Sequence, residues 1–264
     1  MILNANNVLV KYLCSHSGTV RLGPVTNSAP RTARERVREE MTNEILAVAR
    51  DHVARDGAAA LSLRSVARGL GTAPSALYRY FDGRDALLSA LILSSYESLA
   101  AEAERAAADA AHAGGTDAER WKVVPRAVRA WALARPHEWG LIFGTPIPGY
   151  RAPEDTVEPY ARIAIAMMLP MVEAHEAGRL GPGTRPVSRP VSDALRAAIA
   201  PVSDGLFDGA PAERVLVAVE AWTTVVGAVS LEVFGHWRNT ILDPSAYFEA
   251  TLDDVAVALG LGDG

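Results

Sequence analysis

The chain has 264 residues, of which 49% are hydrophobic and 22% charged, and it carries a net charge of −5 at pH 7. These values are ordinary for a water-soluble protein with one large or two modest domains. The single cysteine, Cys14, excludes a disulfide framework and a thiolate metal site and favours a reducing, cytoplasmic location. No uncharged run reaches the roughly 18–20 residues of a membrane span, and no signal-peptide pattern opens the chain, so we expect no membrane partner.

The negative net charge is not spread evenly along the chain. Residues 31–95 contain ten arginines and eight acidic residues, whereas residues 96–264 contain fourteen basic and twenty-three acidic residues. Phosphate attraction depends on local charge and geometry. The overall sign therefore does not exclude nucleic acid as a partner of the N-terminal third.

Residues 1–30 show weak periodicity and clusters of Asn, Ser, Gly and Pro, which predicts a disordered extension. An alternative is that the physiological start lies downstream, near Val25 or Met41.

A helix is predicted from Arg31 to Asp56, because apolar side chains recur there at helical spacing. Gly57 is suited to end this helix. The stripe that we expect to be buried consists of Ile45, Val48, Ala49, His52 and Val53.

Residues 61–91, about thirty positions, contain two short helices and the start of a long third helix, which is the arrangement of a helix-turn-helix unit. Ser62 can cap the first short helix, Gly71 permits the sharp turn, and Pro74 suits the first turn of the second. Each short helix is predicted to span about seven residues, and Asp82 with Asp85 resembles the capping pair of the long one. The expected inward side chains are Leu63, Val66, Ala67, Leu70, Leu77 and Phe81.

Packing does not explain why Ser75, Tyr78, Arg79 and Tyr80 crowd so small a helix. Facing a duplex, they would supply hydroxyl donors, a guanidinium and aromatic rings. Either tyrosine can alternatively belong partly to the core, and a helix-turn-helix can also serve as a protein-interaction module.

This ordered set of features resembles the DNA-binding domain of the tetracycline-repressor (TetR) family over residues 41–95. The resemblance implies phosphate contacts from Ser62 and Arg64, and added charge near phosphate from Arg84. It also implies that Arg31, Arg34, Arg36 and Arg38 form an arm towards the minor groove or backbone, although such a charge run is by itself more often a solvated helix face. The residues that would meet the major groove or its walls are Ser75, Ala76, Tyr78, Arg79 and Tyr80.

Further helices are predicted downstream, and no stretch shows strand alternation, so the fold class is all-α. The predicted organisation is an extension (1–30), a helix-turn-helix domain (31–90) and a C-terminal effector-binding and dimerisation domain (91–264). The downstream helical ranges are 118–134, 136–144, 153–178, 190–203, 211–239 and 244–260.

Residues 129–156 resemble one C-terminal subclass of these regulators, which contains a Trp-Gly helix followed by a Pro/Gly loop. Aromatic and methionine side chains suit an apolar effector pocket, although at helical spacing they more often belong simply to the core. Polar contacts could come from His137, Glu138 and His175; no metal or cofactor is expected, because the zinc-helix pattern is incomplete. The candidate pocket residues are Trp131, Trp139, Phe143, Met167, Met171 and Trp222.

The last two helical stretches, 211–239 and 244–260, are apolar on more than one face and are the expected homodimer surface. The resemblance implies a regulator, most often a repressor, that binds a palindromic operator as a homodimer and is released by a small-molecule effector. No catalytic constellation stands out, so we expect no enzyme.

Overall fold

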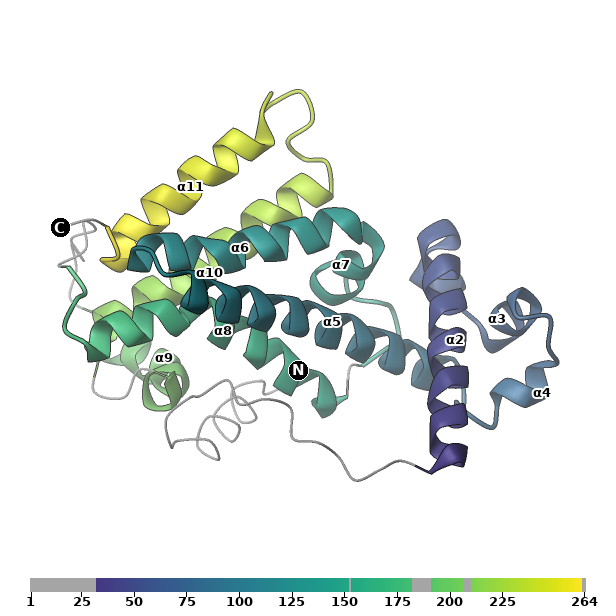
Figure 1. Ribbon diagram of the computed structural model, residues 1–264. Helices are drawn as coiled ribbons and strands as arrows, with labels where there is room; N and C mark the ends of the chain where they lie inside the picture. The colour runs from purple at the N-terminus through teal and green to yellow at the C-terminus, as the bar shows by residue number, and fades with distance from the viewer. Residues whose placement is uncertain (1–31, 152, 182–190, 207–209, 263–264) are drawn as a thin grey trace. The chain divides into compact units, whose positions relative to one another are not determined.

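The computed structural model describes residues 32–151, 153–181, 191–206 and 210–262, and within these ranges the chain forms helices and turns without a strand (Figure 1). The predicted all-α class is confirmed. The expected extension, residues 1–30, lies outside the described residues. Contacts divide the chain into two units: a small unit, described for residues 32–96 and 135–156, and a large unit, described for residues 97–134 and 157–262.

The small unit begins with helix α2 (Ala33–Asp56), whose first turn is fixed by a capping box between Thr32 and Glu35. Gly57 ends α2 with φ of 78°, a conformation that a side chain would disfavour. The remaining elements of this part are η1 (Ala58–Ala60), α3 (Leu63–Gly69), α4 (Pro74–Leu77) and the start of α5 (Arg84–Ala113).

One apolar core holds these elements together. It includes Ile45 and Ala49 from the predicted stripe of α2, and the stripe's His52 and Val53 are buried too, while Val48 is half-buried. From the rest of the small unit it contains Leu61, Leu63, Val66, Ala67, Leu77, Phe81, Leu87, Leu88, Leu91 and Ile92.

Helix α7 (Pro136–Phe143) and the loop after it also belong to the small unit, although about forty residues of the large unit precede them. Leu141, Ile142 and Ile147 pack against the small unit's core. The domain boundary expected at residue 90 assigns this segment to the C-terminal domain, whereas the contacts group it with the helix-turn-helix elements.

The large unit contains the second part of α5, then α6 (Asp117–Ala134), α8 (Val157–Glu176), α9 (Asp193–Leu206), α10 (Ala212–Val233) and α11 (Pro244–Leu259). A short turn, η2 (Glu154–Thr156), precedes α8. The expected helix 211–239 ends at Val233, because the chain turns there and Gly235 takes a φ of 75°.

Within the large unit, α10 packs against α6, α8, α9 and α11, and α6 also packs on α8 and α11 (Figure 1). Ion pairs cross between these helices; for example, Arg129 of α6 donates to both carboxylate oxygens of Glu232, at 2.7 and 2.6 Å. The backbones of Gly181 and Gly260 are joined by a hydrogen bond of 2.9 Å. A Cβ on Gly260 would lie 2.7 Å from the carbonyl oxygen of Gly181, so this close approach requires glycine.

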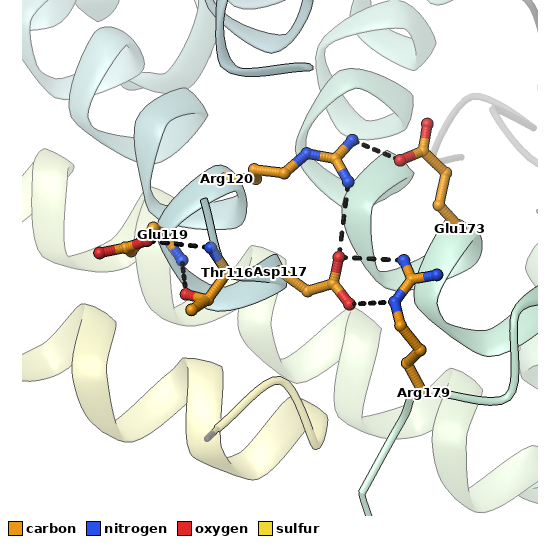
Figure 2. Close-up of polar contacts among 6 residues, drawn as sticks. All are labelled: Thr116, Asp117, Glu119, Arg120, Glu173 and Arg179. Atoms are coloured by element: carbon orange, nitrogen blue, oxygen red, sulfur yellow. Dashed lines mark hydrogen bonds and ion pairs between the residues drawn. The ribbon is translucent and has the colours of Figure 1, made fainter. Parts of the chain in front are cut away.

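A charged cluster ties the start of α6 to the end of α8 (Figure 2). Asp117 accepts hydrogen bonds from Arg179 at 2.8 and 3.1 Å and pairs with Arg120 at 3.4 Å, and Arg120 also binds Glu173. The side chains of Asp117 and Arg120 are only 18% and 17% exposed. The hydrogen bonds from Arg179 hold the pKa of Asp117 below its usual value of 3.8, and the charges of both arginines act in the same direction.

Replacing Asp117 with asparagine is expected to lower the free energy of unfolding by about 1–3 kcal/mol at pH 7. Arg120 would then keep Glu173 as its single acidic partner at a largely buried site. The aspartate's contribution is complete above pH 3.8 and is lost as the pH falls through its lower folded-state pKa. Urea unfolding of both proteins at several pH values measures this difference. A gap that stays constant down to the lowest pH would contradict the assignment.

Candidate nucleic-acid interface

The helix-turn-helix segment is shaped by local capping and by one glycine turn. Ser62 caps α3 as predicted: its hydroxyl accepts from the Ser65 amide at 3.1 Å, and the Ser65 hydroxyl closes the capping box. Gly71 takes a φ of 65° in the turn, and Pro74 occupies the first turn of α4. The chain therefore reverses between α3 and α4 within four residues.

Helix α4 is shorter than the expected seven residues, because its regular hydrogen bonding ends at Leu77. The chain continues in a tighter turn, in which the Tyr80 amide donates to Leu77 at 2.9 Å. Leu77 and Phe81 are 2% and 7% exposed, as the predicted inward anchors should be. Four residues cannot form a stable helix alone, so these anchors determine the segment's conformation.

The outward side of this segment, together with one arginine of α3, is polar and accessible. Ser75 and Arg79 are exposed, and Tyr78 is 54% exposed despite its large ring. Arg64 on α3 is exposed as well. These four side chains are the exposed members of the predicted set, and the others are half-buried.

The other predicted residues are bonded to, or packed against, other parts of the small unit. Ala76 and Tyr80 are half-buried against the core, which agrees with the alternative that one tyrosine belongs partly to the core. The Arg38 guanidinium lies over the Tyr80 ring, 5.3 Å from the ring centroid, in a cation–π contact. Next to it lies a hollow of about 240 Å³ lined in part by Met41, Leu70 and Arg79.

Arg84 is engaged in holding the small unit together. Its guanidinium donates to the carbonyl oxygens of Leu61 and Ala58, both at 3.1 Å, and pairs with Asp85 at 3.2 Å. These bonds tie the start of α5 to the connection between α2 and α3. The phosphate contact expected of Arg84 stays a prediction, and only its unused donor capacity is available for it.

Sequence reasoning missed how α7 docks onto α2 and α5. Glu138, expected to be a ligand contact, is 14% exposed; it accepts from Arg50 at 3.2 Å and from Ser95 at 3.1 Å. Arg50 also donates to Ser94 at 2.6 Å. Arg50 and Glu138 are 88 positions apart, so no local pattern could have paired them.

The six predicted pocket residues fall into two groups. Trp139 and Phe143 stack at 4.3 Å within the small unit, whereas Trp131, Met167, Met171 and Trp222 lie in the large one. Trp131, Met167 and Met171 are buried, and Trp222 is half-buried with its indole N–H donating to Tyr160 at 3.1 Å. Among the residues that the structure describes, no group of His, Cys, Asp and Glu is arranged to hold a metal ion.

A short, core-anchored helical turn that presents Ser, Tyr and Arg side chains next to a capped α3 defines a helix-turn-helix DNA-binding protein. Comparison with known proteins specifies the class further. The family described as bacterial regulatory proteins, tetR family, matches residues 45–91, and the family described as tetracyclin repressor-like, C-terminal domain, matches residues 121–255.

The HTH-type transcriptional regulator Rv1816 of Mycobacterium tuberculosis is 34% identical over 222 residues, which cover 82% of this chain and 91% of that protein. The regulatory protein SCO4313 superposes with a TM-score of 0.65 at 36% identity, covering 86% of this chain and 98% of that one. The chain belongs to the TetR family of transcriptional regulators.

A more distant structure, FadR from Bacillus subtilis in complex with stearoyl-CoA, has a TM-score of 0.57 at 14% identity and covers 83% of this chain and 99% of its own. At that identity the likeness concerns the fold alone.

Proposed function

We propose that this regulator is a ligand-responsive repressor, which binds a palindromic operator as a homodimer and is released by a small-molecule effector. The observation that carries the DNA-binding part is the division of residues 61–81 into a buried anchor and an exposed polar side. Ser75, Tyr78 and Arg79 meet the major groove in this proposal, and Arg64 binds backbone phosphate.

Effector binding is proposed for the large unit, which holds four of the six candidate pocket residues. Burial raises the pKa of Tyr160 above its usual value of 10, so its hydroxyl stays protonated at neutral pH and is oriented by Trp222. Met167 and Met171 on α8 are buried and supply polarizable, apolar side chains. This composition favours a largely apolar effector with few polar groups.

The proposed dimer forms through α10 and α11. Large apolar side chains are exposed on these helices and at their connection, among them Leu231 at 44%, Tyr247 at 48% and Val257 at 39%. Paired with the same helices of a second copy, they would form a four-helix interface with twofold symmetry. Such symmetry suits recognition segments about 34–36 Å apart on a palindromic operator.

Helix α10 is also the one described helix that is long and apolar enough to cross a membrane, with a mean hydropathy of 1.5 and 28% of that stretch buried. Core helices of water-soluble proteins can have the same length and hydropathy. Since four helices of the large unit pack on α10, we assign its remaining apolar surface to the dimer and the regulator to the cytoplasm.

Helix α5 contributes residues to both units, up to Tyr96 in the small one and from Glu97 in the large one. We assign it the mechanical link between effector and operator. An effector that prefers another arrangement of the large unit would shift the population away from the DNA-competent dimer. Operator affinity is to be measured in the presence of each compound of a broad ligand panel. If no compound changes the affinity, this step is contradicted.

The decisive experiment selects binding sites from a pool of genomic DNA fragments and measures affinity for the selected duplex at two salt concentrations. We expect salt-sensitive, sequence-specific binding, with Tyr78→Ala and Arg64→Ala each weakening it about tenfold or more. Tyr78→Ala should also relax sequence preference, whereas Arg64→Ala should weaken all sequences alike. Asp51→Ala, on an exposed site of α2, is the control. Full affinity in both variants would overturn the assignment of the interface.

A further inference from the structure

A surface hollow of the small unit lies between α2 and the segment that follows the α3–α4 turn. Its volume is about 240 Å³, and its lining includes the buried side chains of Ile45 and Leu77 and the 37% exposed Met41. The remaining lining residues are Glu44, Leu70, Thr72, Ala76, Arg79 and Tyr80. Because Met41, Glu44 and Arg79 are exposed, the hollow opens to the surface.

The size of the hollow indicates what can occupy it. Pockets for drug-sized ligands typically measure about 300–1,000 Å³, and a cavity of about 150 Å³ already accommodates one benzene-sized ring. With about 240 Å³, the hollow is small for a drug-sized ligand and suits one or two apolar side chains. Its dimensions therefore favour a peptide segment that inserts its side chains from outside.

The charges at the edge of the hollow also suit a peptide. Within the described part of the chain, the side chains of Glu44 and Arg79 form neither an ion pair nor a hydrogen bond. A guanidinium can donate to backbone carbonyl oxygens, as Arg84 does to Ala58 and Leu61, and Glu44 can pair with a lysine. The complementary segment is thus apolar with one basic side chain.

The sequence before α2 contains such a segment. Residues 8–13, VLVKYL, place five apolar side chains around Lys11, and residues 1–30 contain no acidic residue. The internal stretches outside the described residues, 182–190 and 207–209, contain no comparable run. The family match to the DNA-binding part begins at residue 45, so the 8–13 segment is not part of it.

The chain between this segment and α2 is long enough to bring it to the hollow. Residues 14–31 are eighteen positions, which can span up to about 60 Å. Met41 lies nine residues along the helix from Thr32, which corresponds to about 14 Å. The 8–13 segment can therefore reach the hollow of its own chain.

We propose that the 8–13 segment docks in this hollow, with Lys11 paired to Glu44, and competes with the operator. The hollow shares Arg79 with the proposed major-groove contacts, so a docked segment covers a side chain that DNA requires. Attachment to the same chain gives an effective concentration of about 1 mM, so an intrinsic dissociation constant of about 0.1 mM would make the docked form about tenfold more populated. The docking stands apart from the proposed function, whereas the competition rests on it.

Docking is tested by cross-linking, because Cys14 is the only cysteine of the chain and directly follows the segment. Met41→Cys is compared with Asn43→Cys, an exposed site two residues further and about 200° around α2. Each full-length protein is oxidised with glutathione disulfide at high dilution, and peptide mass spectrometry measures the intrachain disulfide to Cys14. We expect this disulfide to form about tenfold faster in Met41→Cys, and the selected operator duplex to slow it.

Competition is tested by operator affinity. Leu9→Asn combined with Leu13→Asn removes two apolar side chains of the segment without changing the charge, and Val20→Asn is the matched change outside it. The double variant should bind the selected duplex about tenfold more tightly than wild type, because the competing docked form is lost. Val20→Asn should bind as wild type does. Met41→Gln should also tighten binding, but should add nothing in the double variant, since both changes act through docking.

Equal cross-linking rates for Met41→Cys and Asn43→Cys, or wild-type affinity in the double variant, would overturn the inference while leaving operator binding intact. An intact mass showing that the native protein starts at Val25 or Met41 would overturn it too, because the segment would be missing. Failure of wild type to bind any selected duplex, with faster cross-linking in Met41→Cys, would instead refute the proposed operator binding and support the docking.

Discussion

Replacing Trp139 with alanine is expected to lower the free energy of unfolding of the small unit by about 3–5 kcal/mol, the range for removing a large buried aromatic side chain. Trp139 is completely buried and stacks on Phe143, which in turn meets Tyr96 edge-on at 6.2 Å. Tyr96 of α5 also donates to the carbonyl oxygen of Ile142 at 3.0 Å. Loss of the indole therefore loosens α7 from α5, the helix whose first turns share a core with α3 and α4.

Hydrogen exchange read by mass spectrometry is the suitable measurement, because a chain with two units need not unfold in one step. Trp139 is the only tryptophan in the small unit, so tryptophan fluorescence could not follow the unfolding of this unit in the variant. Faster exchange is expected in α2 and in the first half of α5. His137→Ala, at an exposed site on the same helix, should leave exchange unchanged. Unaltered protection in Trp139→Ala would contradict the packing described here.

Leu77→Ala is expected to lower stability by about 2–5 kcal/mol and operator affinity by more than tenfold. Leu77 is 2% exposed and is the only buried residue of α4. The exposed residues Ser75, Tyr78 and Arg79 keep their positions only while this anchor holds the segment on α2 and α3. The change should therefore impair binding without touching any proposed DNA contact.

Affinity of Leu77→Ala is to be measured at a temperature at which circular dichroism shows the native helix content. Leu77→Met is the matched variant, since it keeps the volume and should cost less than about 1.5 kcal/mol. If Leu77→Ala loses stability but keeps full operator affinity, the segment holds its conformation by other means.

The helices were predictable from the sequence because their determinants are local. Ser62 and Ser65 form a cap within four residues, Gly57 and Gly71 take conformations that glycine permits, and the stripe from Ile45 repeats at helical spacing. The end of α4 was not predictable in this way. Its sequence is compatible with a further turn of helix, and the chain's path towards the buried Phe81 sets where the regular bonding stops.

The exposed polar side of the recognition segment was also predictable, because the periodicity that identifies Leu77 as an anchor leaves Tyr78 and Arg79 facing outward. Arg84 and Glu138 show the limit of that reasoning. Their partners are the carbonyl oxygens of Ala58 and Leu61 in one case and the side chains of Arg50 and Ser95 in the other. Such pairings arise from tertiary packing and leave no local signal.

The predicted ligand residues were selected by side-chain type, which does not distinguish a pocket wall from a core. Trp139 and Phe143 turned out to pack within the small unit, together with the loop that follows them. The choice between core and pocket depends on which helices meet, and only the tertiary structure provides that information.

The return of residues 135–156 to the small unit also limits how such regulators can be recombined. A hybrid that joins residues 32–96 to a foreign C-terminal domain would omit residues 135–156, and with them the buried Trp139 and Glu138, the carboxylate partner of Arg50. Its helix-turn-helix part would lack Leu141, Ile142 and Ile147, which pack against its core, and Arg50 would lose its carboxylate partner while keeping Ser94. Transfer of this chain's helix-turn-helix part with its core intact therefore requires two segments, the second taken from near the start of the region that matches the C-terminal domain family.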